Sequence, residues 1–161
     1  MSDLVAIDLL FPNDAPPPSY MQAECDRALK DLKRDCLFKP EKDNQAPYAL
    51  MLSIQENRFV FRMVNAAGEE LPILALSLSP YKRLIKDYKM IIDSYNQMRD
   101  ASAMASKLEA IDMARRGIHN EAAEKMIERL KGKIEINFDT ARCLFTLLFV
   151  LNASQARHQM M

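Results

Sequence analysis

One segment of the 161-residue chain gathers the side chains that could do chemistry. Residues 110–121 read AIDMARRGIHNE and combine carboxylates, guanidinium groups and an imidazole. On a helix, at about 100° per residue, Asp112, Arg115 and His119 fall within roughly 100° of Ile111, on the face that the apolar residues also use. The segment therefore predicts an anion-binding pocket in which Arg115 donates and His119, held by Asp112, titrates. The candidate ligand-binding residues are Asp112, Arg115, Arg116, His119, Asn120 and Glu121.

The same residues also allow a purely structural interpretation. Because an unpaired buried charge is costly, Arg115 needs an anionic partner, either an acidic residue of the sheet or one from a second copy of the chain. His119 would then be a hydrogen-bonded core or interface residue. Gly117 costs about 1 kcal/mol inside a helix, which favours close packing at that position. Two functions follow: a non-catalytic binding or regulatory module, or a small enzyme that acts on a phosphate or carboxylate metabolite through Arg115 and His119.

A second basic cluster lies near the start of the helix expected after Ser79. It consists of Lys82, Arg83, Lys86 and Lys89. With Tyr81 and Tyr88 nearby, such a face could bind the phosphates or bases of a nucleic acid. Asp87 and Asp93 interrupt its positive charge, however, so a solvated helix face is expected and nucleic-acid binding is not.

Other chemistries lack their sequence signatures. The chain has no Walker loop, HExxH or GxSxG motif, and three glycines are too few for a backbone cradle around phosphate. Cys25, Cys36 and Cys143 are odd in number and contain no CxxC pair, which predicts buried, reduced thiols rather than disulfides or a zinc site. We therefore assign no catalytic residue and expect neither a cofactor nor a metal.

Charge and hydropathy exclude further classes. The 22 basic and 22 acidic side chains cancel, so no general attraction to nucleic acid or anionic lipid is expected. The longest purely apolar stretches, near Leu147, are far shorter than the roughly 18 residues that span a bilayer. Together with the reduced thiols, this predicts a cytoplasmic protein without membrane contact.

Periodicity predicts the elements that must position these residues. A short apolar run closed by prolines predicts a first strand at residues 5–11. Period-two alternation predicts strands at residues 48–54, 59–64, 74–78 and 134–138, with a tight turn at Glu56-Asn57. Helical spacing predicts helices at 19–36, 79–98, 106–130 and 139–151. We expect Ser19, Ser79, Ser106 and Asp139 to cap them.

These elements predict one α+β domain over residues 1–151. Its antiparallel sheet of four to five strands is covered by four helices, with the apolar C-terminal helix at the centre and a frayed tail over 152–161. The helices at 80–98 and 106–130 carry more apolar surface than one core requires, from Tyr88, Met90, Tyr95, Met98, Met104 and Met113. This predicts a two-fold homodimer through these helices, or else a protein partner.

Three blocks of the sequence resemble those of a known family. LSLSPYKRLIKDY, RRGIHNE and ERLKGKIEINFDTARCLFTLL are similar, in the same order, to hallmark blocks of a small uncharacterised protein family of alphaproteobacteria. The likeness covers about residues 45–151. Cys143 departs from it, standing where a second basic residue is expected after Arg142, and so do the proline-rich start and the methionine-rich tail. Because no activity comes with this family, the resemblance implies only a bacterial cytoplasmic protein.

Overall fold

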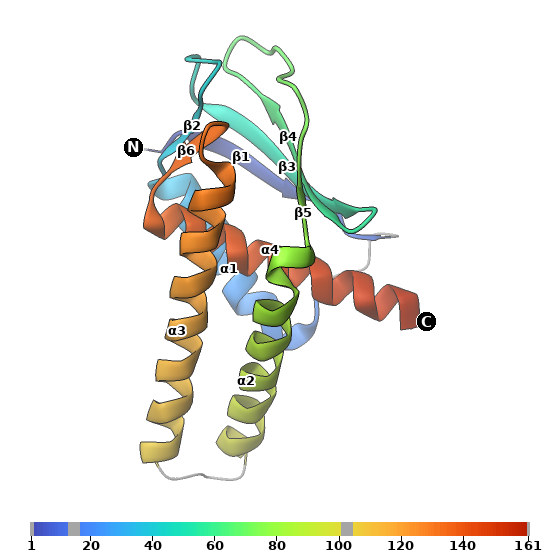
Figure 1. The fold of residues 1–161 in the computed structure, drawn as a ribbon, viewed down its shortest axis with the longest axis vertical. Coiled ribbons are helices and arrows are strands. Elements are labelled where there is room, and N and C mark those ends of the chain that lie inside the picture. The colour runs from blue at the N-terminus through green and yellow to red at the C-terminus, as the bar shows by residue number, and fades with distance from the viewer. Residues whose placement is uncertain (1, 13–16, 101–104, 161) are drawn as a thin grey trace.

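A four-stranded sheet forms one layer of the structure, and the helices gather beneath it (Figure 1). The computed structural model describes residues 2–12, 17–100 and 105–160. The strands of the sheet, in their spatial order, are β1 (Leu4–Leu9), β3 (Tyr48–Gln55), β4 (Arg58–Val64) and β5 (Leu74–Ser77). The expected α+β class is confirmed.

The antiparallel meander expected from the sequence is confirmed for β3, β4 and β5. Glu56 and Asn57 join the first two of these strands with positive φ values of 52° and 61°, as a two-residue hairpin turn requires. The sheet is not antiparallel throughout, however, because β1 pairs with β3 in parallel. Between β1 and β3 the polypeptide passes through a helix, and such a crossover lets the two strands run in the same direction.

A separate two-stranded sheet lies beside the helices. β2 (Phe38–Pro40), which periodicity did not predict, pairs antiparallel with β6 (Ile134–Ile136). The strand expected at 134–138 therefore exists but lies outside the main sheet. Phe38 and Ile136 are both buried, so this small ribbon fixes the chain just after the first helix against the chain just before the last.

In the part of the chain that the structure describes, four long helices complete the fold: α1 (Gln22–Arg34), α2 (Lys82–Asp100), α3 (Ala105–Leu130) and α4 (Phe138–Met160). Every residue from Leu144 to Leu151 is buried, which confirms the central place expected for the last helix. α4 runs on to Met160, and Ser154 is still fully buried, so the packed helix extends into the segment expected to fray. Met161 lies outside the described residues.

The helix starts differ from those expected. Ser19 and Ser79 each lie in a short 3₁₀ turn that leads into α1 or α2, and neither end has a side-chain cap. At α4 the cap is Asn137, whose Oδ1 accepts a hydrogen bond of 2.9 Å from the backbone N–H of Thr140. Asp139 already lies inside the first turn, where it favours the helix through its charge rather than as a cap.

α2 and α3 pack against each other and project beyond the other helices (Figure 1). We call residues 89–97 and 105–118 the arm. Among the arm's residues, all of which the structure describes, Ile92 is the only buried one. The arm also carries three large apolar or aromatic side chains that are exposed, those of Met90, Tyr95 and Met113.

Candidate functional site

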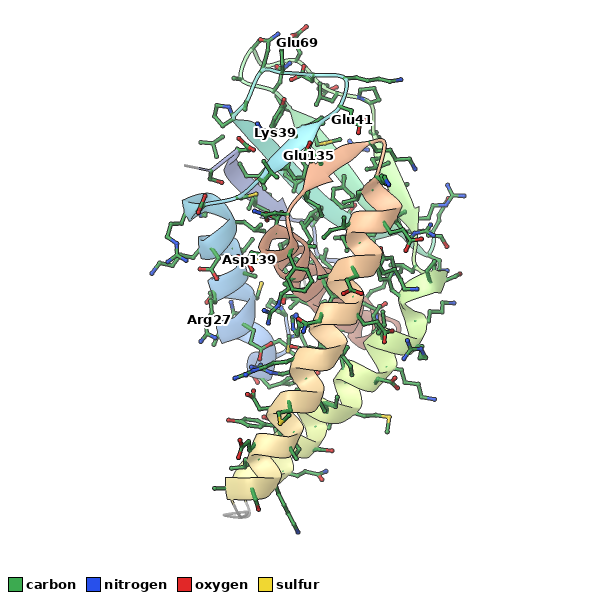
Figure 2. All side chains as sticks on the ribbon, turned by 60° about the vertical axis from the view of Figure 1, so that its left-hand side comes forward. Arg27, Lys39, Glu41, Glu69, Glu135 and Asp139 are labelled. Atoms are coloured by element: carbon green, nitrogen blue, oxygen red, sulfur yellow. The ribbon has the colours of Figure 1, made fainter. Side chains whose placement is uncertain are left out.

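A cavity of about 410 Å³ lies between α1, α3 and the first two turns of α4. Its walls come from α1 and the residue after it (Glu24 to Asp35), the middle of α3 (Arg115 to His119) and the start of α4 (Asp139 to Thr146). Figure 2 shows Arg27 on α1 and Asp139 near the start of α4, two of the charged residues of these walls. Because the three walls are far apart in the sequence, only the tertiary structure brings them together.

Five arginines and four carboxylates line the cavity: Arg27, Arg34, Arg115, Arg116 and Arg142, and Glu24, Asp31, Asp35 and Asp139. Several arginines are already paired, for example Arg34 with Asp31 at 3.2 Å. By contrast, Arg27 and Arg142 form no ion pair with any residue that the structure describes. The cavity therefore contains cations that remain available to an anion.

Arg115 has its anionic partner on α1. Its Nη1 donates to Oε1 of Glu24 at 2.7 Å, and its Nη2 lies 3.4 Å from Oδ1 of Asp112 on its own helix. The sequence predicted a partner from the sheet or from a second copy of the chain, and both expectations are wrong. With 37% of its side chain exposed, Arg115 is internally paired and also forms part of the cavity wall.

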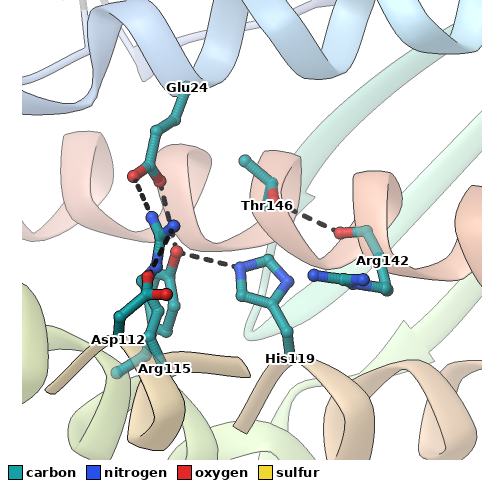
Figure 3. A network of polar contacts seen from close by, with 7 residues as sticks. Glu24, Asp112, Arg115, His119, Arg142 and Thr146 are labelled. Carbon is teal, nitrogen blue, oxygen red and sulfur yellow. Dashed lines mark hydrogen bonds and ion pairs between the residues drawn. The ribbon is translucent and has the colours of Figure 1, made fainter. Parts of the chain in front are cut away.

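His119 is held by Tyr88 and not by Asp112. The Nε2 atom of His119 lies 2.9 Å from the Tyr88 hydroxyl, which in turn donates to Oε2 of Glu24 at 3.2 Å (Figure 3). Burial, reinforced by Arg142 and Arg115, lowers the pKa of His119 to about 4. The ring is therefore neutral near pH 7, which corrects the expectation of a group that titrates close to neutrality.

The positions of the protons along the hydrogen bonds from His119 through Tyr88 to Glu24 follow from the donors that are available. A carboxylate only accepts, so the single Tyr88 hydrogen goes to Glu24, and the Tyr88 oxygen accepts from His119. The neutral ring thus carries its proton on Nε2 and leaves Nδ1 as a bare acceptor. Nδ1 is buried and has no hydrogen-bond partner among the described residues. Figure 3 shows the side chain of Arg142 pointing toward the His119 ring.

The remaining candidates on α3 divide between the cavity and the surface. Arg116 lines the cavity and pairs with Asp112 at 3.0 Å. Asn120 and Glu121 are exposed and do not line it. A Cβ atom placed on Gly117 would meet nothing within 4 Å, so the close packing expected there is wrong.

The basic face of α2 is exposed and separate from the cavity. All four of its cations, Lys82, Arg83, Lys86 and Lys89, are exposed. Arg83 lies 3.3 Å from Asp87 and also pairs with Glu121, and Lys89 lies 2.9 Å from Asp93. Two of the four charges are therefore neutralised by neighbouring carboxylates.

Sequence reasoning missed Glu24, Arg27 and Arg142. Glu24 follows Met21 by three residues and precedes Ala28 by four, so it lies on the buried stripe of α1. Arg142 likewise interrupts an apolar helix. A charge on an apolar face was the signal that singled out Arg115, and it was available for Glu24 and Arg142 too, but not for the exposed Arg27.

The three cysteines described by the structure are all free thiols. Cys25 and Cys36 are buried, whereas Cys143 is half-buried and lines the cavity; burial raises the pKa of each to about 11. Within residues 2–12, 17–100 and 105–160, no three His, Cys, Asp or Glu side chains are grouped so as to hold a metal ion. None of the helices in these ranges is long and apolar enough to cross a membrane.

Known proteins place the chain in one family. The UPF0262 protein of Rhizobium meliloti is 48% identical over 124 residues, which cover 77% of this chain and 78% of that protein. The UPF0262 proteins of Brucella anthropi and Brucella canis are each 48% identical over 126 residues, 78% of both chains. No solved structure matches. The sequence profile of the Uncharacterised protein family (UPF0262) matches residues 2–154, including the proline-rich start that the resemblance had left out, and the chain therefore belongs to this family.

Proposed function

We propose that the protein is a non-catalytic binding module whose ligand is a small anion held in the cavity between α1, α3 and α4. The observation that carries this proposal is Arg142, a cavity-lining, half-buried cation without an ion pair among the described residues. A half-buried charge is costly to leave unpaired, and an exogenous anion is its natural counter-ion. The volume of about 410 Å³ lies in the range of pockets for small organic ligands.

The chemistry of the walls favours binding over catalysis. A general base that works near neutral pH needs a pKa close to 7, whereas that of His119 is about 4. Cys143 has a pKa of about 11 and is a poor nucleophile. Arg115 is already engaged by Glu24. An enzyme acting through Arg115 and His119 is therefore the less favoured alternative.

A ligand-induced thermal shift tests this proposal. Phosphate and small carboxylates should raise the melting temperature of the wild-type protein, because a ligand that binds only the folded state stabilises it. The shift should be lost in Arg142→Gln and retained in Arg83→Gln, which changes an exposed arginine outside the cavity. If no small oxyanion shifts the wild-type melting temperature, the proposal is wrong.

The proposal includes self-association through the arm, in two-fold symmetry. Met90 and Met113 are 59% and 65% exposed, and Tyr95 is exposed as well. A second arm laid against the first would complete a four-helix bundle and cover these side chains. Of the other methionines expected to contribute, Met104 lies outside the described residues, as does the side chain of Met98.

Light scattering tests the dimer. The expected mass is twice the chain mass of 18.4 kDa. The double variant Met90→Glu/Met113→Glu should be a monomer, because each arm would then bury charges against its copy. Met51→Glu, at an exposed methionine of β3 away from the arm, should remain a dimer. A wild-type mass near 18.4 kDa at micromolar concentration would rule out self-association.

We place this module in the cytoplasm, because its three free cysteines are suited to a reducing compartment. Two of the four cations on the α2 face are paired with carboxylates, so nucleic acid is not the favoured partner.

A further inference from the structure

Nδ1 of His119 is a hydrogen-bond acceptor without a donor among the described residues, and it narrows the chemistry of the ligand. We infer that the anion carries its own hydrogen-bond donor, which His119 Nδ1 accepts while Arg142 binds the anionic oxygens. Monohydrogen phosphate and α-hydroxy carboxylates have this chemistry, whereas sulfate and α-keto carboxylates do not. This inference rests on the proposed function, because it assumes that the cavity binds an anion.

Nδ1 of His119 stays an acceptor in the folded protein. Its tautomer is fixed from the other side of the ring, where Nε2 donates to Tyr88 and Tyr88 donates to Glu24. To donate from Nδ1 the ring would need a second proton. Burial and the nearby Arg142 and Arg115 oppose that protonation. A ligand atom beside Nδ1 must therefore supply the hydrogen.

None of the described residues supplies a hydrogen to Nδ1. Nδ1 is closed off from solvent and without a hydrogen-bond partner among the described residues, and His119 is only 8% exposed. A buried acceptor without a donor costs about 1–3 kcal/mol, so its natural use is to receive a donor on binding.

The position of Arg142 suits it to bind the anionic oxygens of such a ligand. Figure 3 shows its guanidinium pointing toward the His119 ring, both residues line the cavity, and the charge of Arg142 helps to lower the pKa of His119. Because Nδ1 is closed off from solvent, binding requires that the anion draw this guanidinium aside toward its own oxygens, which opens Nδ1 to the rest of the ligand. If Arg142 instead turned to donate to Nδ1, the ring would be satisfied without a ligand, and the site would not distinguish anions by their protons.

The strength of the discrimination follows from what a wrong anion leaves behind. An oxygen without hydrogen placed beside Nδ1 sets two lone pairs against each other in a buried site. Sites built around such a polar group reject analogues that lack the matching donor by large factors, up to about 10⁴ or more. We expect at least a tenfold preference, since this cavity is partly open to water.

Calorimetric titration of the full chain at about pH 8 tests the inference, with two matched ligand pairs. Phosphate and sulfate are tetrahedral dianions of similar size, of which only phosphate keeps a proton. Lactate and pyruvate differ in a hydroxyl against a carbonyl. The donor-bearing member of a pair should bind at least about tenfold more tightly, and the pair that binds with the higher affinity identifies the ligand as a phosphate or a carboxylate.

Two variants separate the roles. His119→Phe keeps a buried ring and leaves Tyr88 bonded to Glu24, so it should abolish the preference within a pair. Arg142→Gln should weaken both members alike and preserve their ratio. Equal wild-type affinities within both pairs would overturn this inference and leave the proposed function standing. If no member of either pair binds the wild-type protein, the proposed function itself fails. Because the wild-type comparison decides alone, the test does not depend on the variants folding.

Discussion

Glu24 Oε1 accepts a hydrogen bond of 2.7 Å from Nη1 of Arg115, across 91 residues of sequence. The other oxygen of the same carboxylate accepts from Tyr88, which holds His119. One carboxylate of α1 thus orients groups from α2 and α3. It neutralises Arg115 and at the same time fixes which nitrogen of His119 is free for a ligand.

The ion pair between Glu24 and Arg115 predicts a moderate stability loss. The side chains are 24% and 37% exposed, so solvent screens them in part. Arg115→Ala should cost about 2 kcal/mol, between the roughly 0.2–1 kcal/mol of exposed pairs and the roughly 3–5 kcal/mol of buried ones. Urea denaturation measures it. Arg83→Ala, which removes only exposed pairs, should cost less than about 1 kcal/mol, and equal losses would contradict a special role for Arg115.

His119 predicts a loss of stability in acid. Its pKa is about 4 in the folded chain and about 6.5 in an unfolded one, so the unfolded state binds more protons between these values. Stability should therefore fall as pH drops from about 6.5 toward 4, by up to about 3 kcal/mol from this residue. The difference in unfolding free energy between wild type and His119→Phe, measured across this range, isolates the effect. A difference independent of pH would show that His119 titrates normally.

The thiols should react slowly in the native protein. With a pKa of about 11, only about one thiol in a thousand is a thiolate at pH 8, so modification should be about a hundredfold slower than in the unfolded chain. Cys143, which lines the cavity, should react first, and Cys25 and Cys36 later. Mass spectrometry after timed labelling gives the order. Rapid labelling of Cys25 would contradict its burial in the core.

The cap of α4 can be tested by a matched pair of substitutions. Asn137→Ala removes the hydrogen bond to the Thr140 N–H and should cost about 1 kcal/mol. Asp139→Ala removes only a first-turn charge and should cost about 0.3 kcal/mol. Thermal unfolding of both variants ranks them. The reverse order would restore Asp139 as the cap.

Local patterns predicted the elements well. Period-two alternation predicted β3, β4 and β5, and their turn at Glu56-Asn57 made the antiparallel pairing predictable, because a two-residue turn joins only adjacent strands. The nearly all-apolar run from Leu144 to Leu151 predicted a central helix, because such a helix has no face that favours water. The need of Arg115 for an anionic partner was equally evident, since burying a charge alone is costly.

Tertiary structure decided which partners meet. Whether β1 joins the sheet in parallel, and whether β6 pairs with β2, depends on contacts between distant segments that no local period encodes. The choice of Glu24 as the partner of Arg115 is of the same kind. So is the state of His119: its type predicts a group that titrates near neutrality, but its burial and the hydrogen bond to Tyr88 leave it neutral with a bare Nδ1. A side chain's type sets its chemical range, and its surroundings in the folded chain select one state within that range.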